Sequence, residues 1–573
     1  MSRITWALIF SFLTLTSSGQ SSFHRFDTLF QDFSRFEVSH LNVKSLDNLC
    51  VLAKVWGLMK YYHPKVRSGA YNWDYELFAI LLKVVDVFAG ERDSILLHWI
   101  HTFSYTSFNS DTPLNHTTKQ TDAPYLQWID NSGINMDLRC ALKMIINKKM
   151  GRNSYYIEIG EIPKPEFVNE EKYERNPYPD AGYRLLAIYR YWNVINYYYP
   201  YRDLLGEEWD KILRTNINAF LGAKNEFQYK VQVLKLITSI NDSHASLQKG
   251  GEILENALGD YYAPAEVKIF QGKAVVVNYY NKILGLNSGL MRGDIIESID
   301  GIQVSEIISK KMDITPASNY AVKLREISRN LLRTDSEGIS LSIIRNSIKS
   351  HLSVRCFKLP DEDINYKYHL QDSCCTITRE NVGYINPFLL KATYIPKIMH
   401  LLRGTKGIIL DFRFPPGENI LAIGNYLIRK EQPFAKMTCP TNEHPGLFTY
   451  FVTSKIGGGI ITSSSDIYRS PLVLLNDDET QSAAEFNTMA FRMYNKSIII
   501  GSITAGADGD VSELNIPGGI VTTFSGLGVY YNNGKGTQRV GIIPDKIFKR
   551  TIQGIKDGKD ELLQVAISTI TKK

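Results

Sequence analysis

Two short segments of the chain carry side chains suited to acyl-transfer chemistry. In the first, Ser482 follows an apolar run and a polar loop, and stands at the first turn of a helix predicted for residues 481–494. Backbone N–H groups at a helix start have no partner within the helix, so the N–H of Ala483 could hold an oxyanion beside the serine. A serine at this place can also be a simple N-cap, although Thr480 could fill that role.

The second segment is Asn241-Asp242-Ser243-His244, which follows the apolar run 233–240. A serine hydroxyl needs a base to become a nucleophile, and neutral imidazole serves as one near neutral pH. The polar residues before His244 offer hydrogen-bond partners that could fix its tautomer. A single histidine is more often a packing or surface residue than a base, so this segment alone does not decide the chemistry.

The element that must position Ser482 is an α/β domain predicted for residues 360–573. Residues 407–412, 471–475 and 497–501 are continuous apolar runs bounded by turn signals, which indicates buried strands. The helix predicted for 481–494 lies between two of them. Strands that alternate with helices are typical of α/β folds, in which functional loops lie at strand ends.

A β-rich module is predicted for residues 262–358. Its clearest signal is the order Gly293-Asp294-Ile295-Ile296, an alternating strand, and a turn at Asp300-Gly301. This segment resembles part of the PDZ domain, which binds peptides by adding them as a strand to its sheet. No Gly-Leu-Gly-Phe-like loop precedes Lys273, so a different use of the module, positioning substrate without gripping a C-terminus, stays open.

The region before the module, residues 20–255, is predicted to be mainly helical and contains an internal repeat. Residues 55–64 match residues 191–200, and each copy is followed by a Trp-Asp step, at Trp73 and at Trp209. The spacing of large residues fits amphipathic helices that stop before a proline. We interpret the repeat as a unit of scaffold and its aromatic residues as packing surface.

The first residues predict export. A basic start, an apolar stretch over 4–16 and small residues at 17–19 give the layout of a signal peptide over residues 1–19. The stretch is short for a membrane span, and an uncleaved anchor is the alternative. The protein is therefore expected to be secreted or periplasmic, with no stable membrane insertion. The formal charge of +6 over 573 residues and the lack of a nucleic-acid motif argue against nucleic acid as a partner. Six scattered cysteines leave room for one or two disulfides.

Four motifs in order resemble the tricorn and C-terminal-processing peptidase family. They are Asp242-Ser243-His244, Asp411-Phe412-Arg413, Ser482-Ala483-Ala484-Glu485 and Gly541-Ile542-Ile543-Pro544-Asp545. The PDZ-like module lies between the first and second, as in the family. The resemblance covers about residues 180–570 and implies a multidomain α/β protein with a crotonase-like peptidase core. It also implies a serine peptidase that acts on peptides or proteins through an acyl-enzyme and needs no metal or organic cofactor.

The resemblance also assigns roles to site residues. One branch of the family pairs its serine with a lysine, but Ala507 stands where that lysine would be, so the tricorn-like branch with His244 as base is expected. In that branch a serine and a glutamate stand behind the histidine. The corresponding residues are Ser243 and Gln538, and we expect Gln538 to orient both Ser243 and His244. The second oxyanion donor is expected at Gly417, where relatives carry a pair of glycines.

Two other functions stay open at the level of sequence. Retinoid-binding modules resemble this fold and bind apolar ligands without peptidase activity, and a binding or scaffold protein would tolerate Gln538 and the lost glycine. A carbohydrate hydrolase would need two facing carboxylates, and no such pair stands out. The sequence favours the peptidase, because Ser482 and His244 are both present.

Overall fold

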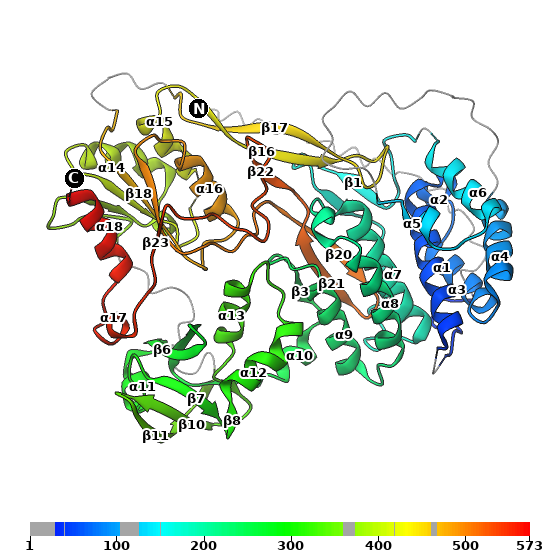
Figure 1. Ribbon diagram of the computed structural model, residues 1–573, viewed down its shortest axis with the longest axis horizontal. Helices are drawn as coiled ribbons and strands as arrows, with labels where there is room; N and C mark the ends of the chain where they lie inside the picture. Colours follow the sequence, from blue (N-terminus) through cyan, green and yellow to red (C-terminus); the bar gives the residue numbers. More distant parts are fainter. Residues whose placement is uncertain are drawn as a thin grey trace, which may run out of the picture.

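The protein is a mixed α/β molecule with three regions (Figure 1). The computed structural model describes residues 29–38, 41–103, 125–148, 150–358, 373–417, 419–459 and 467–572. The expected signal peptide, residues 1–19, lies outside this part. A helical region leads into a central β module and then into a C-terminal α/β core. No helix of the described residues is long and apolar enough to cross a membrane.

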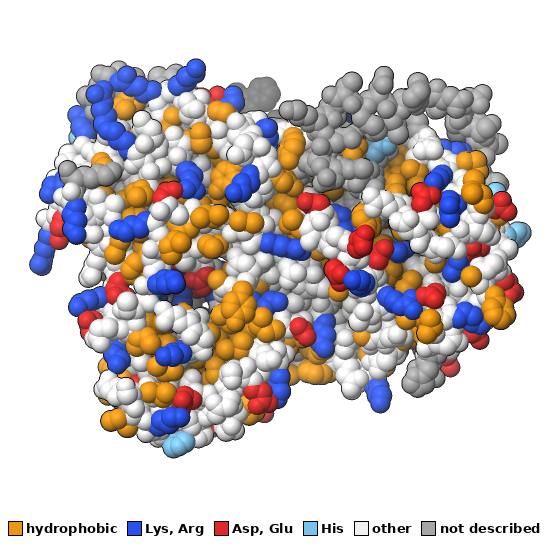
Figure 2. Space-filling view, in the orientation of Figure 1, with side chains coloured by type: hydrophobic (Ala, Val, Ile, Leu, Met, Phe, Trp, Pro, Cys, Tyr) orange, Lys and Arg blue, Asp and Glu red, His pale blue; other side chains and the backbone are white. Residues whose placement is uncertain are grey.

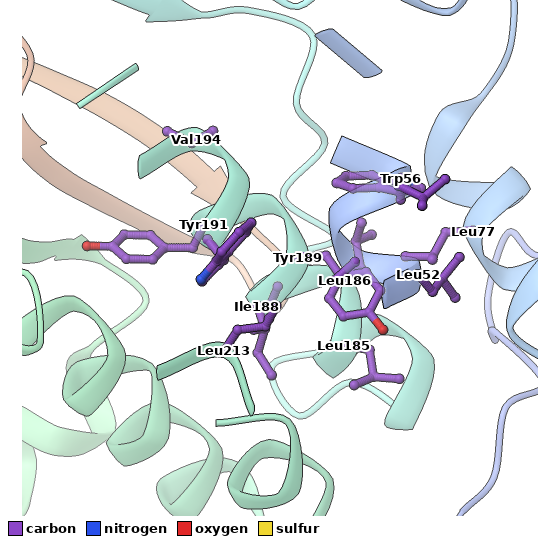
Figure 3. Packing of buried hydrophobic residues seen from close by; sticks show 14 of the residues in the cluster. Leu52, Trp56, Leu77, Leu185, Leu186, Ile188, Tyr189, Tyr191, Val194 and Leu213 are labelled. Atoms are coloured by element: carbon purple, nitrogen blue, oxygen red, sulfur yellow. The ribbon is translucent and has the colours of Figure 1, made fainter. Parts of the chain in front are cut away.

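The helical region supports the prediction of a mainly helical N-terminal half. Its longest helices, α1 and α7, pack against each other and lie in one large hydrophobic cluster. Figure 3 shows Leu52 and Trp56 of α1 beside Leu185 and Tyr189 of α7. Two short strands, β1 (Ile157–Ile159) and β2 (Pro165–Phe167), form a hairpin between the two halves. The helices are α1 (Val43–Tyr62), α2 (Pro64–Arg67), α3 (Trp73–Val84), α4 (Ala89–Thr102), α5 (Trp128–Asn131), α6 (Met136–Ile146), α7 (Ala181–Tyr198), α8 (Glu208–Leu221), α9 (Glu226–Thr238) and α10 (Glu252–Asn256).

Both copies of the internal repeat contain the same pair of reciprocal hydrogen bonds between two tryptophans. The indole N–H of Trp56 donates to the carbonyl of Trp73, and the indole of Trp73 donates back to the carbonyl of Trp56, both at 3.0 Å. In the second copy Trp192 and Trp209 exchange the same two bonds at 2.8 and 3.2 Å. A buried indole N–H needs an acceptor, so these bonds fix α1 to α3 in the first copy and α7 to α8 in the second.

Ion pairs also follow the repeat, because cations of one copy reach acids of the other. Arg190 of the second copy lies 2.6 Å from Asp74 of the first, and Lys54 of the first lies 3.0 Å from Asp210 of the second. The first pair is almost fully buried, whereas the Asp210 side chain is one-third exposed. The two ion pairs are equivalent in the repeat, because each joins the cation of one copy to the aspartate of the other.

The central module, residues 261–358, is built on one antiparallel sheet. Its strands pair in the order β11, β10, β7, β6 and β5, with the short β8 beside β7. Asp300 and Gly301 both have positive φ, which makes the predicted turn between β7 and β8 a tight hairpin turn. The elements are β5 (Ala265–Phe270), β6 (Lys273–Tyr279), α11 (Lys282–Asn287), β7 (Ile295–Ile299), β8 (Ile302–Gln303), α12 (Val304–Lys311), α13 (Tyr320–Arg329), β10 (Gly338–Arg345) and β11 (Ile348–Arg355), with β4 (Tyr261–Tyr262), β9 (Arg333–Thr334) and β12 (Phe357–Lys358) in a small second sheet.

The C-terminal core contains a six-stranded sheet in the order β13, β14, β15, β18, β19 and β23, parallel from β14 onward. Three of its strands match the predicted ones closely, and the helix after β18 is shorter than predicted. The elements are β13 (Cys375–Ile377), β14 (Gly383–Ile385), α14 (Ile395–Leu402), β15 (Ile408–Asp411), α15 (Gly424–Leu427), β18 (Leu472–Asn476), α16 (Ala483–Phe491), β19 (Ser497–Gly501), β23 (Lys546–Ile547), α17 (Ile552–Lys556) and α18 (Glu561–Thr571).

Two hairpins of the C-terminal half leave this core for the helical region. The strands β16 (Gln432–Pro440) and β17 (Phe448–Ile456) form a long arm, with β22 (Val529–Tyr531) beside β16, that reaches the helical region (Figure 1). At its tip the Gly446 N–H donates to the carbonyl of Tyr197 at 2.8 Å. The second hairpin, β20 (Val511–Ile516) and β21 (Ile520–Ser525), pairs with β3 (Ser246–Lys249).

The hairpin of β20 and β21 does not pack with the domain in which the sequence analysis placed it. Leu514, Ile516, Ile520 and Phe524 belong to the same hydrophobic cluster as α1 and α7. Residues 511–525 therefore pack as part of the helical region, although the sequence places them inside the predicted domain 360–573. The six cysteines are all free, so none of the disulfides considered from the sequence is formed.

Candidate active site

Ser482 stands in a strained turn between the buried strand β18 and helix α16. Its backbone has φ 56° and ψ −123°, a conformation that costs a non-glycine residue on the order of 1–3 kcal/mol. The turn is held by the Ser482 N–H, which donates to the carbonyl of Ala507 at 2.9 Å. A strained strand–turn–helix that presents a serine at the end of a buried strand is the arrangement that exposes a nucleophile in other hydrolases.

Two of the four sequence motifs, 482–485 and 541–545, are joined through Thr504 beside the turn that carries Ser482. Glu485, one turn into α16, is fully buried and accepts bonds from the Thr504 hydroxyl and from the N–H groups of Gly506 and Ala507, the last two at 2.8 and 2.9 Å. The same Thr504 hydroxyl accepts from the N–H of Ile542 at 2.6 Å. These bonds fix the loop on which Ser482 rests.

The motif Asp411-Phe412-Arg413 forms a network of ion pairs at the end of β15. Arg413 donates to both carboxylate oxygens of Asp411 at 2.8 and 2.6 Å, and to Asp560 at the start of α18 at 3.0 and 2.7 Å. Tyr384 adds a bond to Asp411 at 2.8 Å. Bidentate pairs of this kind fix geometry as well as add energy, so the motif anchors the loop that continues to Gly417.

His244 lies in the loop before β3, and the Nδ1 side of its ring forms a hydrogen bond. Its Nδ1 lies 2.9 Å from the hydroxyl oxygen of Ser525, at the end of β21, and that hydroxyl donates to Asp242 Oδ1 at 2.9 Å. Burial lowers the pKa of His244 from its ordinary value, with Asp242 and Asp510 acting in the opposite direction. The imidazole is therefore neutral near pH 7, as a general base must be.

The expected roles of Ser243 and Gln538 need correction. The Ser243 hydroxyl accepts from the N–H of Ser318 at 2.8 Å, and the Ser243 N–H donates to the Ser318 hydroxyl at 2.7 Å, so Ser243 faces the central module and not the imidazole. Ser525 occupies the place behind His244 that Ser243 was expected to fill. Gln538 donates to Asp242 at 3.2 Å and to Tyr199 at 3.4 Å, and so orients Asp242 directly.

The two predicted oxyanion donors differ in their availability. Ala483 is exposed, and its N–H lies at the start of α16, where the helix leaves it without an internal acceptor. Gly417 lines the same cavity of about 520 Å³ as Ala483. However, its N–H donates to the carbonyl of Pro387 at 2.8 Å, so the expectation that Gly417 holds the oxyanion is wrong for this conformation.

Ser482 opens into a cleft of about 1020 Å³ where the three regions meet. Residues on both sides of His244, Ser243 and Ala245, line the same cleft, and Gln481 Nε2 lies 3.5 Å from the carbonyl of Ser243. The described residues show no hydrogen bond between Ser482 and the His244 ring. Figure 2 shows hydrophobic side chains gathered near the middle of this face. Catalytic pairs often come into contact only when substrate binds. Ser482 and the two neighbours of His244 line one cleft, in which a bound substrate would contact both segments.

Residues of the central module form ion pairs and a hydrogen bond with the loop that precedes Ser482. Glu479 forms ion pairs with Lys268 of β5 at 3.0 Å and with Arg329 of α13 at 2.6 Å. Burial alone would raise the pKa of Glu479, but these two cations and Arg325 lower it to about 2. Arg325 also donates to Gln481 at 2.8 Å, one residue before Ser482. The position of the module is thus coupled to the position of the serine.

Comparison with known proteins identifies the C-terminal part of the chain. Residues 381–548, which include Ser482 and Gln538, match the model of peptidase family S41. The match covers under a third of the chain and places a region similar to peptidase family S41 around Ser482. No curated protein sequence matches it. Among the described residues, no group of three or more His, Cys, Asp or Glu side chains is placed to hold a metal ion.

Several solved structures are similar to this chain, and three proteases are among them. Mature CPAF complexed with lactacystin is 14% identical, with a TM-score of 0.53, over 69% of this chain and 99% of that chain. The photosystem II D1 C-terminal processing protease is 15% identical over 66% of this chain and 98% of that chain, with a TM-score of 0.37. The tricorn protease is 16% identical over 68% of this chain and 37% of that chain, with a TM-score of 0.36. The CPAF likeness shows a shared fold, and the two lower scores add nothing to it.

One buried acid of the S41 region yields a prediction about stability. Asp508 is fully buried, its Oδ1 accepts from the Gly509 N–H, and its Oδ2 has no partner among the described residues. Burial and the nearby Glu485 raise its pKa well above the ordinary value. A raised carboxyl pKa means that the folded state loses stability as pH rises from the unfolded pKa, about 4, to the folded pKa.

We therefore expect Asp508→Asn to increase the free energy of unfolding at pH 8 by about 1.4 kcal/mol or more, because it removes a carboxyl group whose pKa is raised in the folded state. The increase should shrink toward pH 4, where the wild-type carboxyl is protonated in both states. Urea unfolding at pH 4 and pH 8 measures this. A variant that is less stable than the wild type at pH 8 would show that the charged form of Asp508 has a stabilising partner.

Proposed function

We propose that the protein is a secreted serine endopeptidase of the tricorn-like branch, with Ser482 as nucleophile and His244 as base. The observation that carries the proposal is the placement of Ser482: a strained turn at the start of α16 presents it to the cleft that Ser243 and Ala245 also line. The neutral imidazole held by Ser525 and Asp242 supports the choice of base.

In the proposed reaction, His244 Nε2 takes the proton of Ser482 while the serine oxygen attacks the scissile carbonyl. The Ala483 N–H stabilises the oxyanion, and the imidazolium then gives its proton to the leaving amine. Water, deprotonated by the same imidazole, hydrolyses the acyl-enzyme and releases the second product. The imidazolium formed from that water then returns a proton to Ser482, which restores the starting state of both side chains.

The cleft suits an extended peptide. The strand β3 begins two residues after His244, and its residues line the cleft. Within the described part of the chain, β3 is an edge strand with β21 as its one neighbour. A free strand edge can take up a peptide as an additional strand. Apolar side chains of α9 and α10, including Leu234 and Leu254, line the same cleft. We propose that substrates bind along β3, and that the central module is a PDZ-like domain that positions them.

The proposal is tested by labelling the purified protein with a fluorophosphonate probe, which reacts with activated serines. We expect wild type to be labelled and Ser482→Ala to remain unlabelled. Ser502→Ala, which removes another serine of the same core, serves as the control and should be labelled like wild type. Equal labelling of wild type and Ser482→Ala would mean that the reactive residue is not Ser482. If neither is labelled although a peptide has been shown to bind, the protein is a binding module of the same fold and not a peptidase.

The lowered pKa of His244 predicts the pH dependence of the reaction. The base acts only when it is deprotonated, so kcat/KM should rise with pH through the pKa of His244 in the free enzyme. Because burial lowers that pKa from 6.5, the midpoint of the acid limb should lie below pH 6.5. A pH profile of kcat/KM on a fluorogenic peptide measures it. A midpoint above pH 7 would mean that a charge partner outweighs burial at this ring.

Secretion is proposed from the sequence of residues 1–19, which predicts a cleaved signal peptide. Expression of the full chain with its own N-terminus, followed by N-terminal sequencing of the exported protein, tests this. Cleavage after the small residues at positions 17–19 is the expected result. Protein that stays in the membrane fraction with an intact N-terminus would instead indicate an anchor.

A further inference from the structure

We propose that Asp242 orients His244 through the hydroxyl of Ser525, and that this pair replaces the carboxylate expected at position 538. The inference rests on the proposed function and deepens it, because it assigns the residues that make His244 a base. Ser525 and Asp242 are positioning residues, since neither needs to touch the substrate. Position 538 holds a glutamine, which cannot stabilise an imidazolium by charge.

The directions of the hydrogen bonds follow from the chemistry of the groups. An ionised carboxylate only accepts, so the Ser525 hydroxyl, 2.9 Å from Asp242 Oδ1, must donate its single proton there. The Ser525 oxygen can then only accept from His244 Nδ1, which lies 2.9 Å away. The ring must therefore carry its proton on Nδ1. This leaves the lone pair on Nε2, which is the atom that can take a proton from Ser482.

The surroundings of Asp242 fit a charged acceptor. Its side chain is fully buried, and every polar group that contacts it donates. The N–H groups of His244 and Ser525 donate at 3.0 and 2.7 Å, and the Ser525 hydroxyl and Gln538 Nε2 complete the set at 2.9 and 3.2 Å. A buried carboxylate surrounded by donors holds its place and its charge, and that charge stabilises an imidazolium that forms on the other side of Ser525.

Gln538 fits this arrangement better than a glutamate would. Its Nε2 lies 3.2 Å from Asp242 Oδ1, so a carboxylate in its place would face another carboxylate at close range. Two such groups cannot both be ionised, and one must take up a proton. A glutamine at position 538 instead donates to Asp242 without placing a second carboxylate beside it.

The experiment compares Ser525→Ala with Ser512→Ala and Gln538→Glu. Ser512, on the neighbouring strand β20, is also buried and donates its hydroxyl to the carbonyl of Pro165 at 2.6 Å, so its variant controls for the loss of a buried serine from the same hairpin. Each variant is assayed for kcat and KM on a peptide. The tautomer of His244 is read by ¹⁵N NMR of histidine-labelled protein, with His244→Ala used for assignment. The thermal midpoint shows whether each variant folds.

We expect Ser525→Ala to lower kcat on the order of 10²-fold with little change in KM, and to lose the Nδ1–H tautomer of His244. Ser512→Ala should keep both. Gln538→Glu should lower kcat, whereas a rise would show that the carboxylate belongs at position 538 and would overturn the proposal. A wild-type ring protonated on Nε2, or an unchanged tautomer in Ser525→Ala, would also overturn it. The NMR result does not depend on turnover, so it separates failure of this inference from failure of the peptidase assignment, which the fluorophosphonate probe reports.

Discussion

Replacing His244 by alanine should lower kcat/KM for peptide hydrolysis by about 10⁴- to 10⁶-fold, with the protein still folded. The variant loses the proposed base for the Ser482 proton, and an un-ionised serine hydroxyl is a poor nucleophile near pH 7. Some activity over water should remain, because the oxyanion site at Ala483 and the substrate cleft are untouched. Progress curves at high enzyme concentration, on the peptide used for wild type, measure the loss.

A matched control comes from another histidine. His400, exposed near the end of α14, lies outside the cleft, so His400→Ala should keep the wild-type kcat/KM within about twofold. Near-equal loss in both variants would point to misfolding and would be checked by circular dichroism. Retention of most activity in His244→Ala, with loss in Ser482→Ala, would mean that another residue or a water activates the serine.

The sequence located the parts of this site that are local. The order of strand, polar loop and helix around Ser482 predicts both the turn and the buried strand behind it, because these features depend on neighbouring residues. Glu485 also stands within one of the four motifs, and the structure shows that it accepts a hydrogen bond from the Thr504 hydroxyl. The repeated Trp-Asp step likewise predicts a repeated unit, and the reciprocal Trp56–Trp73 and Trp192–Trp209 bonds show it.

Contacts between residues that are far apart in the sequence could not be predicted. Ser525 reaches His244 because β21 pairs with β3, across 281 positions of the chain. Nothing in the sequence around Ser525 marks it, since it ends a strand in which all residues are buried. Proximity along the chain also misleads: Ser243 adjoins His244, but its hydroxyl points to Ser318. At Gly417 the sequence predicts a free N–H, whereas folding pairs it with Pro387.

The largest expected effect on stability is at Arg190, which lies at the centre of the internal repeat. Its fully buried guanidinium lies 2.6 Å from Asp74 and 2.9 Å from Glu170. The same group donates to the carbonyl of Asn515 at 2.8 Å, on strand β20. Burial alone would lower the pKa of Arg190, but the two acids raise it, so the charge is held. Arg190→Met should cost about 3–5 kcal/mol, because it leaves two buried carboxylates with Lys60 as their remaining cation.

The repeat supplies the matched control at the equivalent position of the first copy. Lys54→Met breaks the pair with Asp210, whose side chain is one-third exposed and can be solvated by water, so its cost should stay near 1 kcal/mol. Differential scanning fluorimetry of the two variants should therefore show a clearly larger drop in midpoint for Arg190→Met. Because Arg190 also holds β20, and β21 of the same hairpin carries Ser525, peptidase activity should decline below that midpoint as the hairpin loosens. Equal shifts in the two variants would mean that burial does not set the cost of breaking these pairs.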